Sequence, residues 1–180
     1  MLTYSSLGSA TISLEGGKKT IVVFPGKTSP KDALILKSSP DEVPEEGTIS
    51  WPGEYDMDGM TIRGIGHNDG AKVSFVVELE GVRTAFIAPP LHEWSDYEIE
   101  LLGDIDVLCL PAEDLKIVQK LIDEVDPRVL IPLQTKDEDD FREVLKVCGA
   151  VGKESVPEFK LKGKSSLPQE GREVVVLKKN

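Results

Sequence analysis

The sequence contains few imidazole and thiol side chains, which bind zinc or, as thiols, form disulfides. Only two of its 180 residues are cysteines and only two are histidines. Cys109 lies in a strand-like apolar run and Cys148 on a helix-like face. Because neither has a second cysteine at CxxC spacing, a thiolate zinc site is not indicated. We expect two buried, free thiols in a reducing cytoplasm rather than a disulfide.

Positive charge is scarce, and long apolar runs are missing. Lys and Arg total 21 against 32 Asp and Glu, which gives a net charge of −11. Such a negative field disfavours binding to nucleic acid or to anionic membranes, so we expect neither as a partner. No apolar run reaches membrane-spanning length, and the first residues lack the basic-then-apolar pattern of a signal peptide. From these two absences we expect the protein to be cytoplasmic.

What is present is typical of one globular domain covering residues 1–180. Hydrophobic residues make up 39% and charged residues 29%, which is an ordinary balance for such a domain. The length suffices for one substantial core, and no internal repeat or long linker divides it.

The first half of the chain has the pattern of strands joined by tight turns. Asp58-Gly59 is the strongest two-residue hairpin signal, and further hairpins are expected at residues 15–18 and near Glu80-Gly81. Residues 32–36, "DALIL", read as a short buried strand. Apolar residues alternate along 73–79, which predicts a strand with one buried face.

The second half changes to a strand–helix–strand pattern. Residues 105–111 form an apolar run suited to a central strand, and apolar residues then recur at helical spacing over 115–125 until Asp126-Pro127 ends the helix. A strand at 128–133 follows, so these two strands should be parallel. A second helix over 137–149 with Gly149 as its C-cap, and a final strand in 171–179, complete the prediction. The fold class is α/β (α+β), with two sheets and outer helices in a four-layer αββα sandwich.

Four motifs resemble the small metallo-β-lactamase-fold hydrolases. They are "ISWPGEYDMDGMTIRGI", "VSFVVELEGVRTAFIAPPLHE", "LGDIDVLCLPAED" and "DPRVLIPLQT", and they cover most of Trp51 to Thr135. The Pro52-Gly53-Glu54-Tyr55 turn is similar to that of a bacterial subgroup related to ascorbate lactonases. The resemblance implies a reduced sandwich of metallo-β-lactamase type and, in active members, a zinc-dependent hydrolase.

The positions at which that family carries metal ligands hold other residues in this chain. In place of the Thr-His-x-His-x-Asp-His motif the chain has "KSSPDEV", and it has "FIAP" and "IPLQ" where the family has a bridging Asp and a final His. His67 matches a family loop that gives one ligand, and His92 matches a histidine beside the family site. The resemblance thus implies these vestigial site positions: Ser38, Pro40, Glu42, Val43, His67, Pro89, His92 and Gln134.

These replacements remove the chemistry that the family uses. A catalytic zinc ion needs about three protein ligands and an open position for water. Pro40 and Pro89 have no donor side chain, Val43 cannot bind metal, and the Gln134 amide oxygen is a weak donor. We therefore predict no catalytic residues and no cofactor: a metal-free, non-catalytic pseudoenzyme acting in binding or assembly. A homo-oligomer is a further expectation, because a shortened scaffold can cover apolar surface by pairing.

The sequence leaves two alternatives open. The first is a zinc-dependent hydrolase with an incomplete, rebuilt site of His67, Asp69 and His92, to which the loop acids Asp41 and Glu42 could add. Against it, a lone histidine without co-ligands binds metal poorly and more often makes local hydrogen bonds. The second alternative is a metal-free enzyme that uses acids such as Glu42 or Glu54.

Other motifs in the chain are incomplete. In "RGIGHNDG", Asp69 stands where a dinucleotide-binding fingerprint needs its third glycine. The run "DEDD" at 137–140 lacks the glycine and the spaced glutamate of an EF-hand, and we interpret it as a helix start. Trp51 and Trp94 are expected to anchor a turn and a helix against the core.

Overall fold

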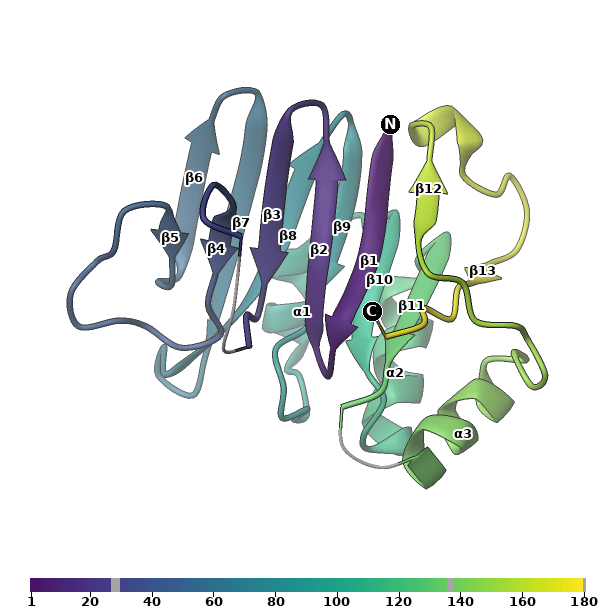
Figure 1. Ribbon diagram of the computed structural model, residues 1–180. Coiled ribbons are helices and arrows are strands. Elements are labelled where there is room, and N and C mark those ends of the chain that lie inside the picture. The colour runs from purple at the N-terminus through teal and green to yellow at the C-terminus, as the bar shows by residue number, and fades with distance from the viewer. Residues whose placement is uncertain (27–29, 136–137, 180) are drawn as a thin grey trace.

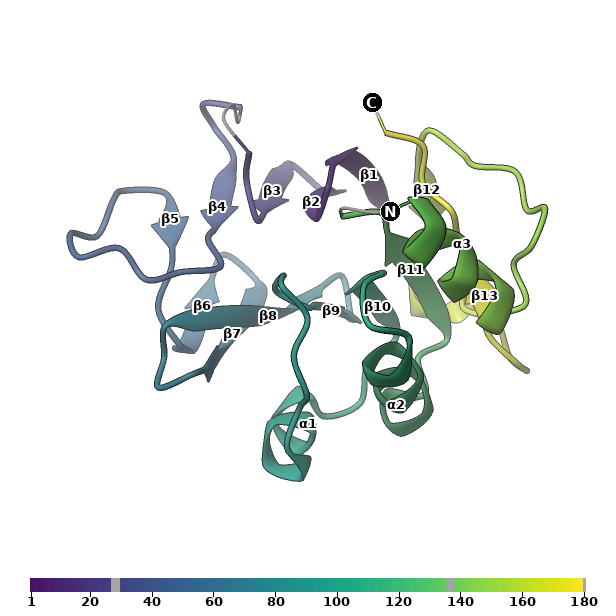
Figure 2. The same cartoon turned by 90° about the horizontal axis from the view of Figure 1, so that it is seen from below.

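The computed structural model describes residues 1–26, 30–135 and 138–179, with no side-chain description for 138–140. It is a sandwich of two sheets with helices on one side (Figures 1 and 2). The interpretation of 137–140 as a solvated helix start concerns side chains outside the described part.

The first sheet is mainly antiparallel and has six strands. In spatial order these are β12 (Phe159–Leu161), β1 (Leu2–Gly8), β2 (Thr11–Gly16), β3 (Lys19–Val23), β4 (Leu34–Leu36) and β5 (Thr48–Ile49). Strands β3, β4 and β5 run parallel to one another. The short β4 lies within residues 32–36, the "DALIL" run for which the sequence predicted a strand.

The second sheet has seven strands and combines hairpins with parallel strands. Its order is β13 (Glu173–Val174), β11 (Val129–Leu133), β10 (Val107–Pro111), β9 (Val82–Phe86), β8 (Lys72–Leu79), β7 (Met60–His67) and β6 (Gly53–Met57). β9, β10 and β11 are parallel, and β10 and β11 are joined through a helix as the sequence predicted. The expected C-terminal strand is reduced to two residues in β13.

Three helices accompany the second sheet: α1 (Asp96–Leu102), α2 (Leu115–Val125) and α3 (Glu138–Val147), besides the short 3₁₀ turn Lys164–Ser166. Figure 2 shows α1 and α2 beneath this sheet and α3 beside β11. Val118, Leu121 and Val144 from these helices pack with Ile65, Val76 and other residues on the outer face of the sheet. Among the described residues no helix covers the outer face of the first sheet. The α/β class and the paired sheets are confirmed, and the helical layer lies on one side.

The main core fills the space between the two sheets. Inward-facing residues such as Leu14 and Ile21 from the first sheet meet Phe75, Phe86 and Ile131 from the second. Alternation along β8 places Val73, Phe75 and Val77 in this core and Ser74 and Val76 on the opposite face. The alternation that the sequence showed therefore identifies the face in the inter-sheet core, but the prediction of a single buried face is wrong for β8, because the helical layer covers its other face.

The predicted turns are found at their residues. Asp58 and Gly59 both have positive φ, and so do Glu80 and Gly81, as two-residue hairpins require. Strands β1 and β12 and helix α1 have no counterpart in the sequence-based prediction. The β1 segment mixes serine with apolar residues, and α1 is only 7 residues long, so neither gives a strong periodic signal.

Two glycines of the incomplete fingerprint have a packing role. A Cβ on Gly64 would lie 2.7 Å from the Trp51 carbonyl oxygen, and one on Gly66 would lie 2.8 Å from Cγ of Pro52. The turn at Trp51-Pro52 thus packs directly on β7, which explains why small residues occur there.

Both cysteines are free, as expected, with Cys109 buried and Cys148 half-buried. Burial raises the pKa of both thiols. Among the described residues, no helix is long and apolar enough to cross a bilayer.

Candidate functional site

A pocket of about 470 Å³ lies where β4 and β9 end. Ser38, just beyond β4, and Pro89, just beyond β9, both line it, although they are far apart in sequence. The Val73 amide donates to the Ser38 carbonyl oxygen at 2.8 Å and fixes the loop after β4 against β8. The remaining lining residues are Ser9, Ala10, Thr11, Phe24, Pro25, Gly26, Lys37 and Ser39.

Gln134 borders a neighbouring, smaller pocket of about 300 Å³. Ser9 lines both pockets, so Gln134, Ser38 and Pro89 surround adjoining parts of the molecule. Pro40 is half-buried, whereas Glu42 and Val43 are exposed, and none of these three lines either pocket. The structure thus brings three of the eight expected positions to one region and leaves the other five, the two histidines included, outside both pockets.

The larger pocket offers no typical zinc donor. Its described lining includes hydroxyl groups and one ammonium group but no imidazole, thiol or carboxylate side chain. The Lys37 ammonium lies 2.8 Å from Asp41 and 3.0 Å from Glu45, and these hydrogen bonds raise the pKa of Lys37. Zinc prefers imidazole, thiolate and carboxylate ligands, so the residues here do not fit the metal that the fold implies.

The two histidines lie elsewhere, in a cluster between the second sheet and α1. His67 is 1% exposed. Its Nδ1 is 2.6 Å from Oε1 of Glu98 and its Nε2 is 3.0 Å from the Ser74 hydroxyl oxygen. The Ala88 amide also donates to that hydroxyl oxygen, at 3.0 Å. Both nitrogens of His67 are therefore used by hydrogen bonds.

His92 completes the cluster together with a buried lysine. The Lys72 ammonium donates to the Pro90 carbonyl oxygen at 2.6 Å and to Nδ1 of His92 at 2.7 Å. Nε2 of His92 lies 3.7 Å from Oε1 of Glu98 and has no hydrogen-bond partner in the part of the chain that the structure describes. Trp94 packs beside both imidazoles, with ring centroids 4.5 Å from His67 and 6.0 Å from His92.

Local sequence explains why Glu98 is held in place. Ser95 and Glu98 form a capping box at the start of α1, in which Glu98 Oε2 accepts from the Ser95 amide at 2.7 Å. Ser74 and His67 come from paired strands, β8 and β7. A capping box followed by a helix is a recognisable S-x-x-E signal, but sequence reasoning missed both Glu98 and Lys72 as members of this cluster.

Burial and hydrogen bonds set the charges of the cluster. Burial opposes ionisation of Glu98, but the hydrogen bonds from His67 and Ser95 outweigh it and lower the pKa of Glu98 to about 2. Burial also lowers the pKa of His67 and His92, and the nearby Lys72 charge lowers both further. Since ionised Glu98 can only accept, Nδ1 of His67 carries the proton and Nε2 accepts from Ser74.

The cluster has two arrangements known from enzymes. Ser74, His67 and Glu98 are connected like a nucleophile, base and orienting acid. Ser74 is 0% exposed, however, so no substrate can reach it. His67, His92 and Glu98 also place possible ligand atoms within 4.8 Å of one another. Asp69, the third member expected for a rebuilt site, is not in this group and lies exposed in the turn after β7.

Comparisons with known proteins relate the whole chain to one fold. No protein-family model and no curated protein matches it. A candidate Zn-dependent hydrolase of the metallo-β-lactamase superfamily from Thermotoga maritima is 25% identical, with 98% of each chain covered and a TM-score of 0.79.

Two more distant structures share the fold. A candidate metal-dependent hydrolase from Veillonella parvula is 12% identical, covering 89% of this chain and 100% of its own, with a TM-score of 0.64. An isothiocyanate hydrolase from Delia radicum gut bacteria is 11% identical, covering 88% and 98%, with a TM-score of 0.58.

Proposed function

Because this chain belongs to the metallo-β-lactamase-fold superfamily, we propose that it is a metal-independent binding protein built on a hydrolase fold. Its ligand occupies the pocket beside Ser38 and Pro89. The observation that carries the proposal is the lining of that pocket, which contains hydroxyl groups and Lys37 but no imidazole, thiol or carboxylate among its described residues.

The lining also indicates the kind of ligand. Ser9, Ser38 and Ser39 supply hydroxyl groups that both donate and accept, and Phe24 and Pro89 supply apolar surface. The charge of Lys37 is already balanced by Asp41 and Glu45. A small, uncharged polar molecule fits these groups better than an anion does.

Elemental analysis tests the metal-independent part directly. The protein is purified without a His-tag and without chelators, and its zinc, iron and manganese contents are measured. Less than about one metal per ten chains is expected, since the donor set lacks the ligands that hold zinc. Stoichiometric metal that survives dialysis would sink the proposal.

A second candidate is a metal-dependent hydrolase that uses His67, His92 and Glu98. Their possible ligand atoms are grouped within 4.8 Å, and Nε2 of His92 is buried without a hydrogen-bond partner among the described residues. Two contacts disfavour this candidate. Both ring nitrogens of His67 take part in hydrogen bonds, and the Lys72 ammonium contacts the imidazole of His92. If wild-type protein holds zinc and His92→Ala loses it, this candidate replaces the first.

The idea of a metal-free acid-based enzyme receives no support from the geometry. Glu42 is exposed, and Glu54 is exposed and ion-paired with Arg63 at 2.6 Å. Neither residue lines the pocket beside Ser38.

A further inference from the structure

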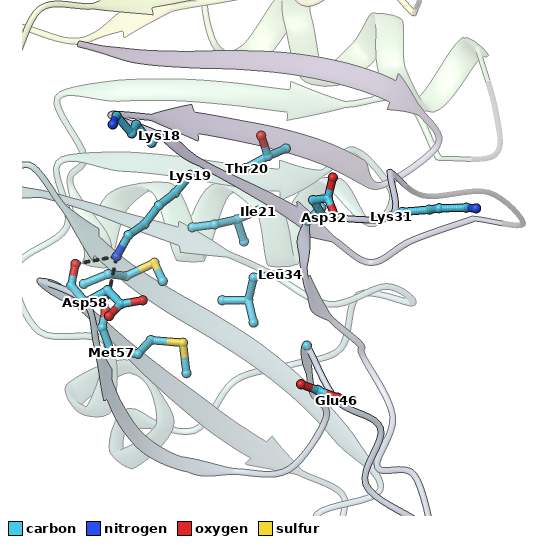
Figure 3. Close-up of a pocket in the computed structure, with 13 residues that line it drawn as sticks. Lys18, Lys19, Thr20, Ile21, Lys31, Asp32, Leu34, Glu46, Met57 and Asp58 are labelled. Atoms are coloured by element: carbon cyan, nitrogen blue, oxygen red, sulfur yellow. Dashed lines mark hydrogen bonds between the residues drawn. The ribbon is translucent and has the colours of Figure 1, made fainter.

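A second concave region lies at the opposite ends of β3 and β4, between the two sheets. It has a volume of about 570 Å³, within the range of small-molecule sites. Figure 3 shows it bordered by the start of β3 and by the turn between β6 and β7. It shares no lining residue with the pocket beside Ser38.

The strand register explains why this region is open. β4 begins at Leu34, which pairs with Ile21, so Lys19 and Thr20 at the start of β3 have no partner in β4. The β6–β7 hairpin extends to Asp58-Gly59 at the same end of the sandwich. A gap is therefore left between the first strands of one sheet and the hairpin of the other.

The floor of this gap is apolar. Ile21 and Met60 are buried beneath it, whereas Leu34 and Met57 are only half-buried. Two large apolar side chains thus remain partly in water on a concave surface. Covering them with a ligand would remove apolar area from water, which is favourable by roughly 25 cal/mol per Å².

One wall carries an ammonium group that is held in a fixed place. Lys19 Nζ donates to the backbone carbonyl oxygens of Met57 and Asp58, and Figure 3 shows it reaching toward that turn. Among the described residues, no carboxylate forms an ion pair with it. An ammonium group has three donors, so one N–H and the full positive charge are left for a ligand.

The other charges of the lining limit how much negative charge a ligand can carry. Three lysines are offset by Asp32, Glu46 and Asp58, in a chain that as a whole has 21 bases against 32 acids. A multiply charged anion would be repelled by the acids, whereas one carboxylate can pair with Lys19.

We propose that this cavity binds a small amphipathic monocarboxylate. Its apolar chain lies over Met57, Met60 and Leu34, and its carboxylate accepts from Lys19. This site is separate from the one of the proposed function, and each can fail without the other.

The chain offers a direct probe, because it contains only three methionines and two of them line the cavity. Protein labelled at the methionine methyl carbons is titrated with octanoate and observed by NMR, with signals assigned through Met57→Leu and Met60→Leu. Both cavity methyl signals should shift in a saturable manner at millimolar octanoate. The Met1 signal should stay in place, since Met1 is outside the cavity.

The charge is tested with matched probes and variants. Octanol and octylammonium share the apolar chain and should bind more weakly than octanoate. Lys19→Gln should weaken octanoate binding by about tenfold, the size of one charge-assisted hydrogen bond, and leave octanol binding unchanged. Lys116→Gln, on the exposed side of α2, should change neither. Unmoved methyl signals, equal binding of octanoate and octylammonium, or full binding by Lys19→Gln would each overturn the proposal.

Discussion

Lys72 places a buried ammonium group in the histidine cluster. It is 9% exposed, and its ammonium group contacts His92 and lies near Glu98 and Glu113. Burial lowers the pKa of Lys72, and the two glutamates oppose that shift. A positive charge beside the imidazole pair repels a second cation. Lys72 thus adds a positive charge close to the group formed by His67, His92 and Glu98.

Removing this charge should make the cluster a better metal site. We expect Lys72→Gln to bind one zinc ion with at least about tenfold higher affinity than wild type, since a single like charge at contact distance is worth more than about 1.4 kcal/mol. Isothermal titration with zinc measures the change. Lys116→Gln should behave as wild type, and adding His92→Ala to Lys72→Gln should abolish the gain. Equal zinc affinity of Lys72→Gln and wild type would contradict this role.

Ser74 should matter for stability although it touches no ligand. Its hydroxyl group serves both His67 and the Ala88 amide. Ser74→Ala leaves two buried polar groups without a partner and should lower the free energy of unfolding by about 1–3 kcal/mol. Urea unfolding measures this loss. Ser166→Ala, at an exposed position, is the control and should change the free energy by less than about 0.5 kcal/mol.

Helix α1 is the element that assembles the cluster. It spans only 7 residues, Asp96–Leu102, and buries Leu102 against the second sheet. So short a helix is marginal without its cap and its packing. Its capping box therefore has two roles: it starts the helix and it orients the Glu98 carboxylate toward His67.

The two roles predict coupled effects of mutations. Ser95→Ala should cost about 1 kcal/mol of unfolding free energy, as is usual for a lost N-cap. Asp114→Ala, at the N-cap of α2, should cost a similar amount and is the matched comparison. When each is combined with His67→Gln, only Ser95→Ala should deviate from additivity, because Ser95 and His67 share Glu98. Additive effects for both pairs would show that the cap and the cluster are independent.

At the scale of the whole molecule, the one-sided helical layer gives the sheets different environments. The central strands of the second sheet are covered on both faces, and their polar groups there are held by hydrogen bonds such as those of His67 and Ser74. The first sheet places Thr3, Ser5 and Glu15 on its other face, as expected for a sheet face that meets water. The buried His67 and Lys72 and the half-buried His92 are accordingly found on the helical side.

This arrangement predicts a stability that falls on mild acidification. His67 and His92 have lowered pKa values in the folded state, so below about pH 6.5 the unfolded chain binds protons that the folded chain does not. The free energy of unfolding that depends on these histidines is therefore fully present above that pH. It is lost as the pH falls toward the lowered pKa values of the folded state. Each histidine contributes at most about 1.4 kcal/mol per pH unit. Glu98 adds a further loss only between its ordinary pKa and about 2.

Thermal or urea unfolding between pH 7 and pH 5.5 measures the effect. The groups that face the histidines are Lys72 from β8, Glu98 and Trp94 from the α1 region, and Ser74. His92→Asn removes one of the two titrating imidazoles and should reduce the drop. A drop of unchanged size in His92→Asn would assign the pH dependence to other groups.

The sequence by itself determined the features that depend only on residues close together along the chain. Asp58-Gly59 and Glu80-Gly81 set their turns through local φ angles, and the spacing of Val118, Leu121 and Ile122 set one face of α2. The sequence also showed that Ser38, Pro89 and Gln134 lack the side chains that usually bind zinc, because the donor atoms of a side chain depend only on the residue type.

Only the tertiary structure decided which distant side chains meet. Glu98 is 31 positions from His67 and Lys72 is 20 positions from His92, so their contacts depend on how α1 packs on β7 and β8. The cavity under Lys19 likewise results from the register of β3 and β4 against a hairpin of the other sheet. The periodicity of apolar residues predicts which face of a helix or strand is buried. Packing across the whole core determines which other element covers that face.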